Sequence, residues 1–273
     1  MNLLAGADRL PRALLALEDG SCYAGQCCGS EGEAFGELVF NTSMTGYQEI
    51  VTDPSYAGQV VTLTYPQVGN YGVTATDGQA AAPALRALVV RDMCFEPSNW
   101  QSVQSLPDYL RQEGVVAIQG VDTRALTLKV REAGAMRAAV STTDLDPASL
   151  VARVRASSPI GSHNFVGDVS VGERAALAPQ PAPSGRPRRV VAYDCGMKRG
   201  IADALRARGL ELVVVPWDTP AEEALALGPD AAFLSNGPGD PQSVGATQEA
   251  ARALLGRLPV FGICLGTQLM VLA

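Results

Sequence analysis

The sequence of 273 residues is poor in histidine and in long hydrophobic runs, and each of these two shortages excludes a class of protein. No apolar run approaches the roughly 18 residues that a membrane-spanning helix needs, and residues 1–12 lack the apolar core of a signal peptide. With 21 basic and 28 acidic residues, the net charge of −7 argues against neutralisation of nucleic-acid phosphates. We therefore expect a cytoplasmic protein that binds neither nucleic acid nor a membrane.

Metal and disulfide sites are not expected either. The chain has six cysteines and one histidine, and no two cysteines form a C-x-x-C pair. A zinc site of the usual Cys/His kind needs more ligands than these, and scattered thiols are unlike a disulfide scaffold. We expect the chain to hold no metal.

A proline-rich stretch, residues 173–189 (ERAALAPQPAPSGRPRR), separates two regions of different patterning. Proline-rich composition favours an extended spacer, although a long surface loop inside one domain would look the same. We expect a first domain over residues 1–172, a linker over 173–189 and a second domain over 190–273.

Short apolar runs broken by Gly, Pro and Asn fill the first region and predict a mixed α+β domain. Helices are expected at Val103–Glu113 and Thr123–Glu132, where Ser102 and Asp122 are available as N-caps. The expected strands are Ala13–Leu17, Ser21–Gly25, Glu37–Phe40, Val60–Tyr65, Leu88–Val90 and Val115–Gln119.

Apolar strands alternate with helices after the proline-rich stretch, which is typical of an α/β fold with a doubly wound, mainly parallel sheet. Such sheets bind ligands at the carboxyl ends of their strands. The expected order is strand Val190–Tyr193, helix Lys198–Arg208, strand Glu211–Val215, helix Ala221–Leu227, strand Ala231–Leu234, helix Thr247–Arg257 and strand Val260–Ile263.

Two loops at these strand ends carry candidate chemistry. Residues 262–266 (GICLG) have the spacing of a nucleophile elbow, with Cys264 as the nucleophile and glycines that permit a sharp strand-to-helix turn. The helix N-terminus would favour a thiolate at Cys264, and the N–H group of Leu265 could stabilise an oxyanion. The alternative is a buried cysteine in a glycine-flanked turn. The second loop, Ser235–Pro241, offers N–H donors beside the elbow, or is simply a turn.

These motifs resemble sequences of known families. Residues 260–268 (VFGICLGTQ) and 233–241 (FLSNGPGDP) are similar to class I (Cys-His-Glu) glutamine amidotransferases. Nearly the whole chain is similar to the small subunit of carbamoyl-phosphate synthetase. That resemblance is carried by residues 36–56 (GELVFNTSMTGYQEIVTDPSY), 60–66 (VVTLTYP) and 121–127 (VDTRALT), and residues 191–199 (VAYDCGMKR) resemble the first strand of the amidotransferase domain in one member of that class.

The resemblance implies a subunit that hydrolyses L-glutamine and passes ammonia to a large subunit. The large subunit makes carbamoyl phosphate from bicarbonate with ATP and Mg, for arginine or pyrimidine biosynthesis, and no cofactor is implied for this chain itself. Cys264 would form a glutamyl thioester, with oxyanion donors at Leu265 and Gly239. Positions that match glutamine contacts in the family are Ser55, Gly237 and Gln268.

The sequence departs from the family after the elbow. The family's His-Pro-Glu motif, which supplies the base, lies well beyond the nucleophile, whereas this sequence ends at Ala273. The one histidine, His163, is expected to be a surface or loop residue. We therefore expect a truncated chain that is inactive alone. The alternatives are a catalytically silent chain that only docks on the large subunit, a chain completed by a separate polypeptide, and a different cysteine hydrolase or isomerase.

Overall fold

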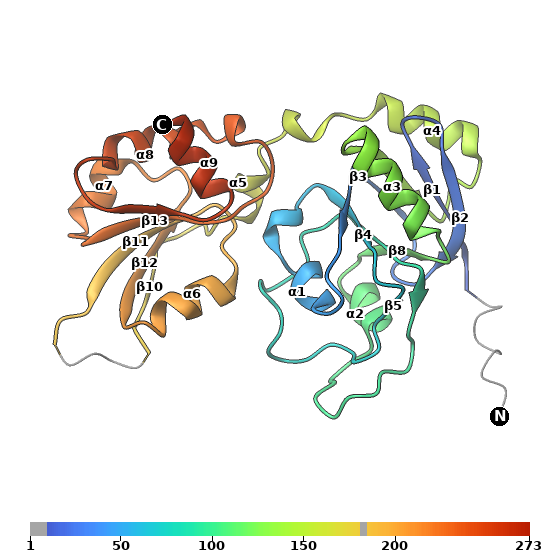
Figure 1. Cartoon of the computed structure of the whole chain (residues 1–273), viewed down its shortest axis with the longest axis horizontal. Helices are drawn as coiled ribbons and strands as arrows, with labels where there is room; N and C mark the ends of the chain where they lie inside the picture. The colour runs from blue at the N-terminus through green and yellow to red at the C-terminus, as the bar shows by residue number, and fades with distance from the viewer. Residues whose placement is uncertain (1–9, 181–184) are drawn as a thin grey trace. The chain divides into compact units, whose positions relative to one another are not determined.

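The computed structural model describes residues 10–180 and 185–273, and the chain divides into two compact units (Figure 1). Unit 1 ends at Ile160 and unit 2 begins at Gly161. Residues 1–12 lack a signal-peptide pattern in their sequence. Residues 1–9 of that stretch lie outside the described residues. In the described part of the chain, no helix has both the length and the apolar character needed to cross a membrane.

Seven strands of unit 1 close into a barrel in the order β1-β2-β8-β6-β4-β3-β9. Neighbours among β3, β4, β6 and β8 run parallel, and every pair that includes β1, β2 or β9 is antiparallel. The predicted mixed α+β class is confirmed, and the closure of the barrel is new. The strands are β1 (Arg12–Leu17), β2 (Cys22–Cys27), β3 (Glu33–Asn41), β4 (Gln59–Leu63), β6 (Ala87–Val89), β8 (Val116–Gln119) and β9 (Met136–Ser141), and β5 (Gln67–Val68) pairs with β7 (Asp92–Met93) outside the barrel.

The helices of unit 1 are α1 (Tyr47–Val51), α2 (Leu106–Gln112), α3 (Thr123–Ala133) and α4 (Pro147–Ala156). A side chain caps the N-terminus of α2, α3 and α4, whereas α1 follows Gly46 and has no side-chain cap. Asp122 caps α3 as predicted, by accepting a hydrogen bond from the Ala125 N–H. The prediction of Ser102 as the cap of the preceding helix is wrong. That helix starts three residues later, where Ser105 accepts from the Asp108 N–H.

The side chains of β1 alternate between two hydrophobic clusters, which explains why this strand is buried almost throughout. Leu15 and Leu17 share a cluster with Leu126 of α3. Leu14 and Ala16 face the other way and pack in the cluster that holds Leu150 of α4. Because both faces of β1 are buried, its sequence is a nearly continuous apolar run and does not alternate between apolar and polar residues.

Unit 2 contains a five-stranded sheet in the order β10-β12-β11-β13-β14, covered by helices on both faces. Four strands are parallel and β10 is antiparallel to β12, so the predicted doubly wound, mainly parallel class is confirmed. The elements are α5 (Phe165–Val169), β10 (Ala175–Leu177), β11 (Arg188–Asp194), α6 (Arg199–Arg206), β12 (Leu210–Pro216), α7 (Ala221–Ala226), β13 (Ala231–Leu234), α8 (Gly245–Leu254), β14 (Val260–Gly262) and α9 (Leu265–Leu272).

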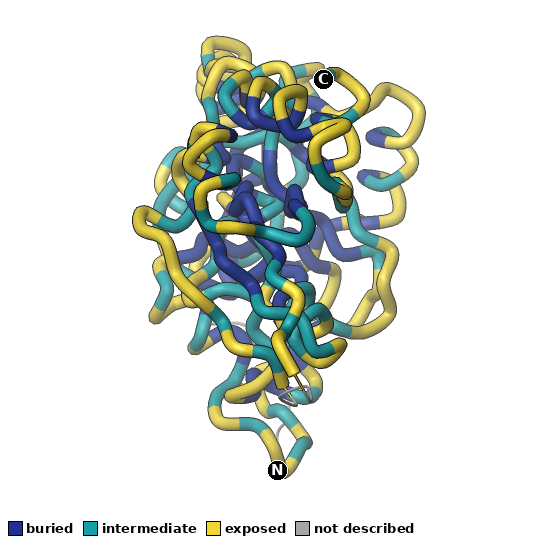
Figure 2. The backbone as a smooth tube through the Cα atoms, turned by 90° about the vertical axis from the view of Figure 1, so that its left-hand side faces the viewer, coloured by how far each residue is buried: buried dark blue, intermediate teal, exposed yellow. Residues whose placement is uncertain are grey.

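Alternate residues of β11 again face opposite layers. Val191 and Tyr193 pack in the cluster that holds residues of α7, α8 and α9, whereas Val190 and Ala192 pack with Ala202 of α6. Figure 2 shows buried backbone concentrated inside and exposed backbone outside. The strands β11, β13 and β14 are parallel neighbours. Their carboxyl ends, and the loops that follow them, thus lie side by side at the same end of the sheet.

The stretch expected to be a linker, residues 173–189, contains structure that belongs to unit 2. Ala175–Leu177 form β10, which pairs with β12, and β11 begins at Arg188. Ahead of it, Val166 of α5 packs in the core of unit 2. The structure thus divides the chain at residues 160 and 161, because hydrogen bonding and burial attach this stretch to the second sheet. Residues 181–184 of the expected linker lie outside the described residues.

Candidate active site

Cys264 stands on a strained turn between β14 and α9. Its φ of 53° and ψ of −113° make it the one non-glycine residue with a positive φ in the part of the chain that the structure describes. Such a conformation costs of order 1–3 kcal/mol and is typical of functional sites. The residue is exposed, so the alternative of a buried cysteine does not apply.

The glycines on either side of Cys264 are required by close packing. A Cβ at Gly262 would lie 2.6 Å from the carbonyl carbon of Gly266, and one at Gly266 would lie 2.1 Å from the carbonyl oxygen of Leu234. Neither obstacle is a movable side chain, since both are backbone atoms. The turn therefore has the tight strand-to-helix shape that the spacing predicts for a nucleophile elbow.

The first turn of α9 leaves one N–H group for a ligand. Gly266 donates to the carbonyl of Ser235 at 3.0 Å, and Gln268 donates to the carbonyl of Cys264 at 3.1 Å. Thr267 also donates to Cys264, at 2.9 Å. The N–H of Leu265 has no acceptor among the described residues, so it is the donor available beside the Cys264 thiol.

The loop after β13 is fastened to its neighbours by two buried side chains. The Ser235 hydroxyl accepts from the Cys195 N–H at 2.9 Å and donates to the Asn236 carbonyl at 2.7 Å. The Asn236 amide donates to the Gly196 carbonyl at 2.9 Å and accepts from the Lys198 N–H at 3.2 Å. These contacts and the bond from Gly266 to Ser235 join three segments, namely the loop after β11, the loop after β13 and the first turn of α9. We call these joined segments the frame.

Gly237 and Gly239 occupy this frame for different reasons. A Cβ at Gly237 would lie 2.1 Å from the Cys195 carbonyl oxygen, so close approach excludes a side chain. Gly239 has a φ of +81°, which favours glycine, and its N–H has no acceptor among the described residues. The two predicted oxyanion donors, at Leu265 and Gly239, are thus both free N–H groups on loops that the frame connects.

Cys195 lies next to this frame but is unsuited to nucleophilic chemistry. It is fully buried, and burial raises the pKa of its thiol to about 12. It therefore stays a neutral thiol at physiological pH. Asp194 beside it accepts from the N–H groups of Gly196 and Met197 through one oxygen, at 2.9 and 2.7 Å, and shapes the loop after β11.

The remaining candidates lie elsewhere in the structure. Gln268 is exposed on the first turn of α9, and Ser55 lies in a short 3-10 helix of unit 1, where its N–H donates to Asp53 at 2.9 Å. The glutamine contacts of both stay predictions. His163 is exposed in unit 2 and its Nε2 lies 2.7 Å from Asp168. In the described residues, no cluster of three or more His, Cys, Asp or Glu side chains could hold a metal ion.

Sequence reasoning missed Ser235, Asn236 and Asp194 as residues that support the site. All three are buried polar residues at the carboxyl end of a buried strand. That position was itself the signal, since a polar side chain buried there must find hydrogen-bond partners and so fixes the loop.

Two family models match the chain. The carbamoyl-phosphate synthase small chain, CPSase domain matches residues 15–140, and the class-I glutamine amidotransferase model matches residues 191–273. These two matches lie on either side of the division between the units.

Similar proteins agree with these matches. A carbamoyl phosphate synthase small chain from Syntrophotalea carbinolica is 48% identical, over 96% of this chain and 72% of its own length. One from Thermosynechococcus vestitus is 49% identical over 96% and 71%. The pyrimidine-specific small chain of Bacillus subtilis is 44% identical over 95% and 69%. A solved aminopeptidase from Aneurinibacillus has 13% identity, a TM-score of 0.28 and coverage of 95% and 69%, a likeness too weak to carry an argument.

The family expected from the sequence motifs is thus confirmed by relatives aligned along most of the chain. The match of the amidotransferase model includes the whole elbow around Cys264 and the loop with Gly237 and Gly239. The chain belongs to the carbamoyl phosphate synthase small chain family.

Proposed function

We propose that Cys264 is the nucleophile with which this chain hydrolyses glutamine. The role of glutamine-hydrolysing subunit comes with the family, and the observation that supports this residue is the strained, exposed position of its thiol between two required glycines. An elbow of this shape presents a side chain to substrate while the backbone stays fixed.

The reaction proceeds through a thioester. The Cys264 thiolate attacks the side-chain carbonyl carbon of glutamine, and the carbonyl oxygen becomes an oxyanion that accepts hydrogen bonds from Leu265 and Gly239. The C–N bond then breaks, and the nitrogen takes up a proton from water, in place of the one that the Cys264 thiol lost to solvent, and leaves as ammonia. A glutamyl thioester remains on Cys264. Water attacks the thioester, which releases glutamate and restores the thiol.

The wider assignment also belongs to this proposal. Relatives are named small chains, which supports a large-chain partner that consumes the ammonia. ATP and Mg would act on that partner, and this chain would need no cofactor of its own. The complex would work in the cytoplasm, and the relative named pyrimidine-specific favours a link to pyrimidine biosynthesis.

A glutamine-like alkylating agent, 6-diazo-5-oxo-L-norleucine, tests the nucleophile. We expect intact mass and peptide mapping to show one label on Cys264, and an excess of L-glutamine to protect it. Cys264→Ser should lose the label and also abolish glutamate release in the native complex. The matched control is Cys94→Ser, which changes a partly exposed cysteine of unit 1 and should leave both unchanged. Glutamate release that survives in Cys264→Ser would contradict the proposal.

A further inference from the structure

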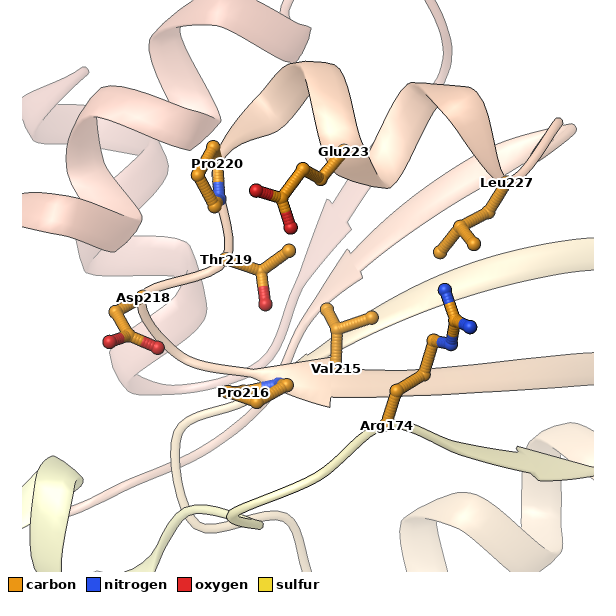
Figure 3. Close-up of a pocket in the computed structure, with 8 residues that line it drawn as sticks. All are labelled: Arg174, Val215, Pro216, Asp218, Thr219, Pro220, Glu223 and Leu227. Atoms are coloured by element: carbon orange, nitrogen blue, oxygen red, sulfur yellow. The ribbon is translucent and has the colours of Figure 1, made fainter.

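Unit 2 has a cavity of about 320 Å³ away from the elbow, at the carboxyl end of β12. Its walls come from the end of β12, the loop that follows, α7 and the residue before β10 (Figure 3). The size lies at the lower end of the range of about 300–1,000 Å³ typical of small-molecule sites. The lining residues are Arg174, Val215, Pro216, Asp218, Thr219, Pro220, Glu223 and Leu227.

The cavity carries three charged groups that have no ion-pair partner. Arg174, Asp218 and Glu223 are exposed and form no salt bridge among the described residues, whereas Arg189 of β11 pairs with Glu211 of β12. In Figure 3, Arg174 points up from the segment before β10, and Glu223 points down from α7 toward the same space. The summed charge of one cation and two anions is −1.

A buried hydroxyl next to the cavity also has no partner. Tyr193 is fully buried, its Oη makes no hydrogen bond, and it pairs in register with Val215, which lines the cavity. Paired residues of neighbouring parallel strands project from the same face of the sheet, so Tyr193 stands beside Val215 beneath α7. Burial raises the pKa of Tyr193, and the negative charge of Glu223 raises it further.

We propose that this cavity is a second ligand site, which binds a small basic α-amino acid. One carboxylate of the ligand pairs with Arg174, and its two ammonium groups pair with Glu223 and Asp218. A ligand with one negative and two positive groups complements the −1 charge of the walls, and binding would satisfy charged groups that now face only solvent.

Calorimetric titration of the native protein with L-lysine tests the proposal. We expect saturable binding of one equivalent, weakened at least tenfold by Arg174→Gln and by Glu223→Gln. L-Norleucine, which lacks the side-chain ammonium, and 1,5-diaminopentane, which lacks the carboxylate, should each bind at least tenfold more weakly than L-lysine. Binding should persist in Cys264→Ser and in the presence of excess L-glutamine.

Two matched variants control for loss of charge alone. Arg208→Gln removes an exposed cation two residues after α6, and Glu249→Gln removes an exposed anion on α8, both outside the cavity. Both should bind L-lysine as the parent protein does. The proposal is overturned if L-lysine does not bind, or if Arg174→Gln and Glu223→Gln bind it normally. It is also overturned if 1,5-diaminopentane or L-norleucine binds equally well, or if excess L-glutamine displaces L-lysine, which would place L-lysine at the elbow.

Discussion

At the scale of single residues, Gly266, two residues after the nucleophile, tightly constrains the active site. We predict that Gly266→Ala abolishes labelling of Cys264 by the glutamine analogue, since its Cβ would lie 2.1 Å from the Leu234 carbonyl oxygen. Overpacking of this kind costs about 1–3 kcal/mol, and relief requires the elbow to move away from β13. Labelling rates and thermal unfolding measure the two effects.

The control for this change is Gly245→Ala at the start of α8. Nothing lies within 4 Å of the place that its Cβ would take, and the φ of Gly245 is not positive. We therefore expect normal labelling and unchanged or slightly raised stability. Normal labelling of Gly266→Ala would mean that the elbow tolerates displacement, and the requirement for close packing would be refuted.

The residues that carry chemistry were predictable where their spacing was unusual. Cys264 stood out because glycines flank it two residues away on both sides, and the structure shows the turn they permit. Ser235 and Asn236 did not stand out, because their role depends on partners such as Cys195 and Gly196 that lie about 40 positions earlier in the chain. Contacts of that separation leave no local pattern in a sequence.

At the scale of elements, α4 is attached to the barrel by an ion pair as well as by apolar packing. Arg153 of α4 donates to both carboxylate oxygens of Glu33 on β3, at 2.9 and 2.5 Å, and Ser141 of β9 donates to the same carboxylate. The hydrogen bonds from Arg153 lower the pKa of Glu33 from 4.5 to about 2. The apolar side of α4, including Leu150, packs on β1.

This attachment predicts a stability difference that depends on pH. A carboxylate with a lowered folded-state pKa stabilises the fold above its unfolded-state pKa, and the contribution is lost as pH falls from about 4.5 toward 2. Because Arg153 is 44% exposed, solvent screening limits the contribution to about 1 kcal/mol. Glu33→Gln should therefore unfold more easily than the parent at pH 7 and equally easily near pH 2, by urea denaturation.

A charge change outside the ion pair provides the comparison. Glu132→Gln removes an exposed carboxylate of α3 in the same unit, outside the contacts between α4 and β3, and should unfold in urea at pH 7 as the parent does. A constant difference between Glu33→Gln and the parent from pH 7 to pH 2 would show that the ion pair has no role in attaching α4.

Elements were predictable from local pattern, and their connections were not. Ala231–Leu234 was predicted to the residue, because a short apolar run between a glycine turn and a polar loop leaves little choice. The strand β9 was missed, since the run from Met136 to Ser141 contains Arg137, whose guanidinium pairs with Glu18. The barrel depends on pairings such as β3 with β9, about 100 residues apart, which periodicity cannot reveal.

At the scale of the two units, the sheets differ at their edges among the residues that the structure describes. Unit 1 closes its main sheet into a barrel, which leaves no unpaired edge, and its hydrophobic clusters lie within its own residues. In unit 2, β14 has β13 as its one neighbour among the described strands, and Phe261 on it is 57% exposed. Val271 of α9 is also exposed, at 81%.

These differences predict that the units behave differently when produced separately. Residues 1–160 should fold alone, with a cooperative thermal transition by circular dichroism, because a closed barrel needs no further strand to satisfy its backbone. Residues 161–273 should self-associate in size-exclusion chromatography, since an apolar edge strand offers hydrogen-bonding groups beside an exposed aromatic ring.

Phe261→Lys should reduce that association, because a charge on an edge strand opposes pairing with a second copy. Val244→Lys could not serve as a comparison for Phe261→Lys, because Val244 is fully buried and not at the edge of the sheet. A monomeric second fragment, or a first fragment without a cooperative transition, would show that edge closure does not govern how these units fold.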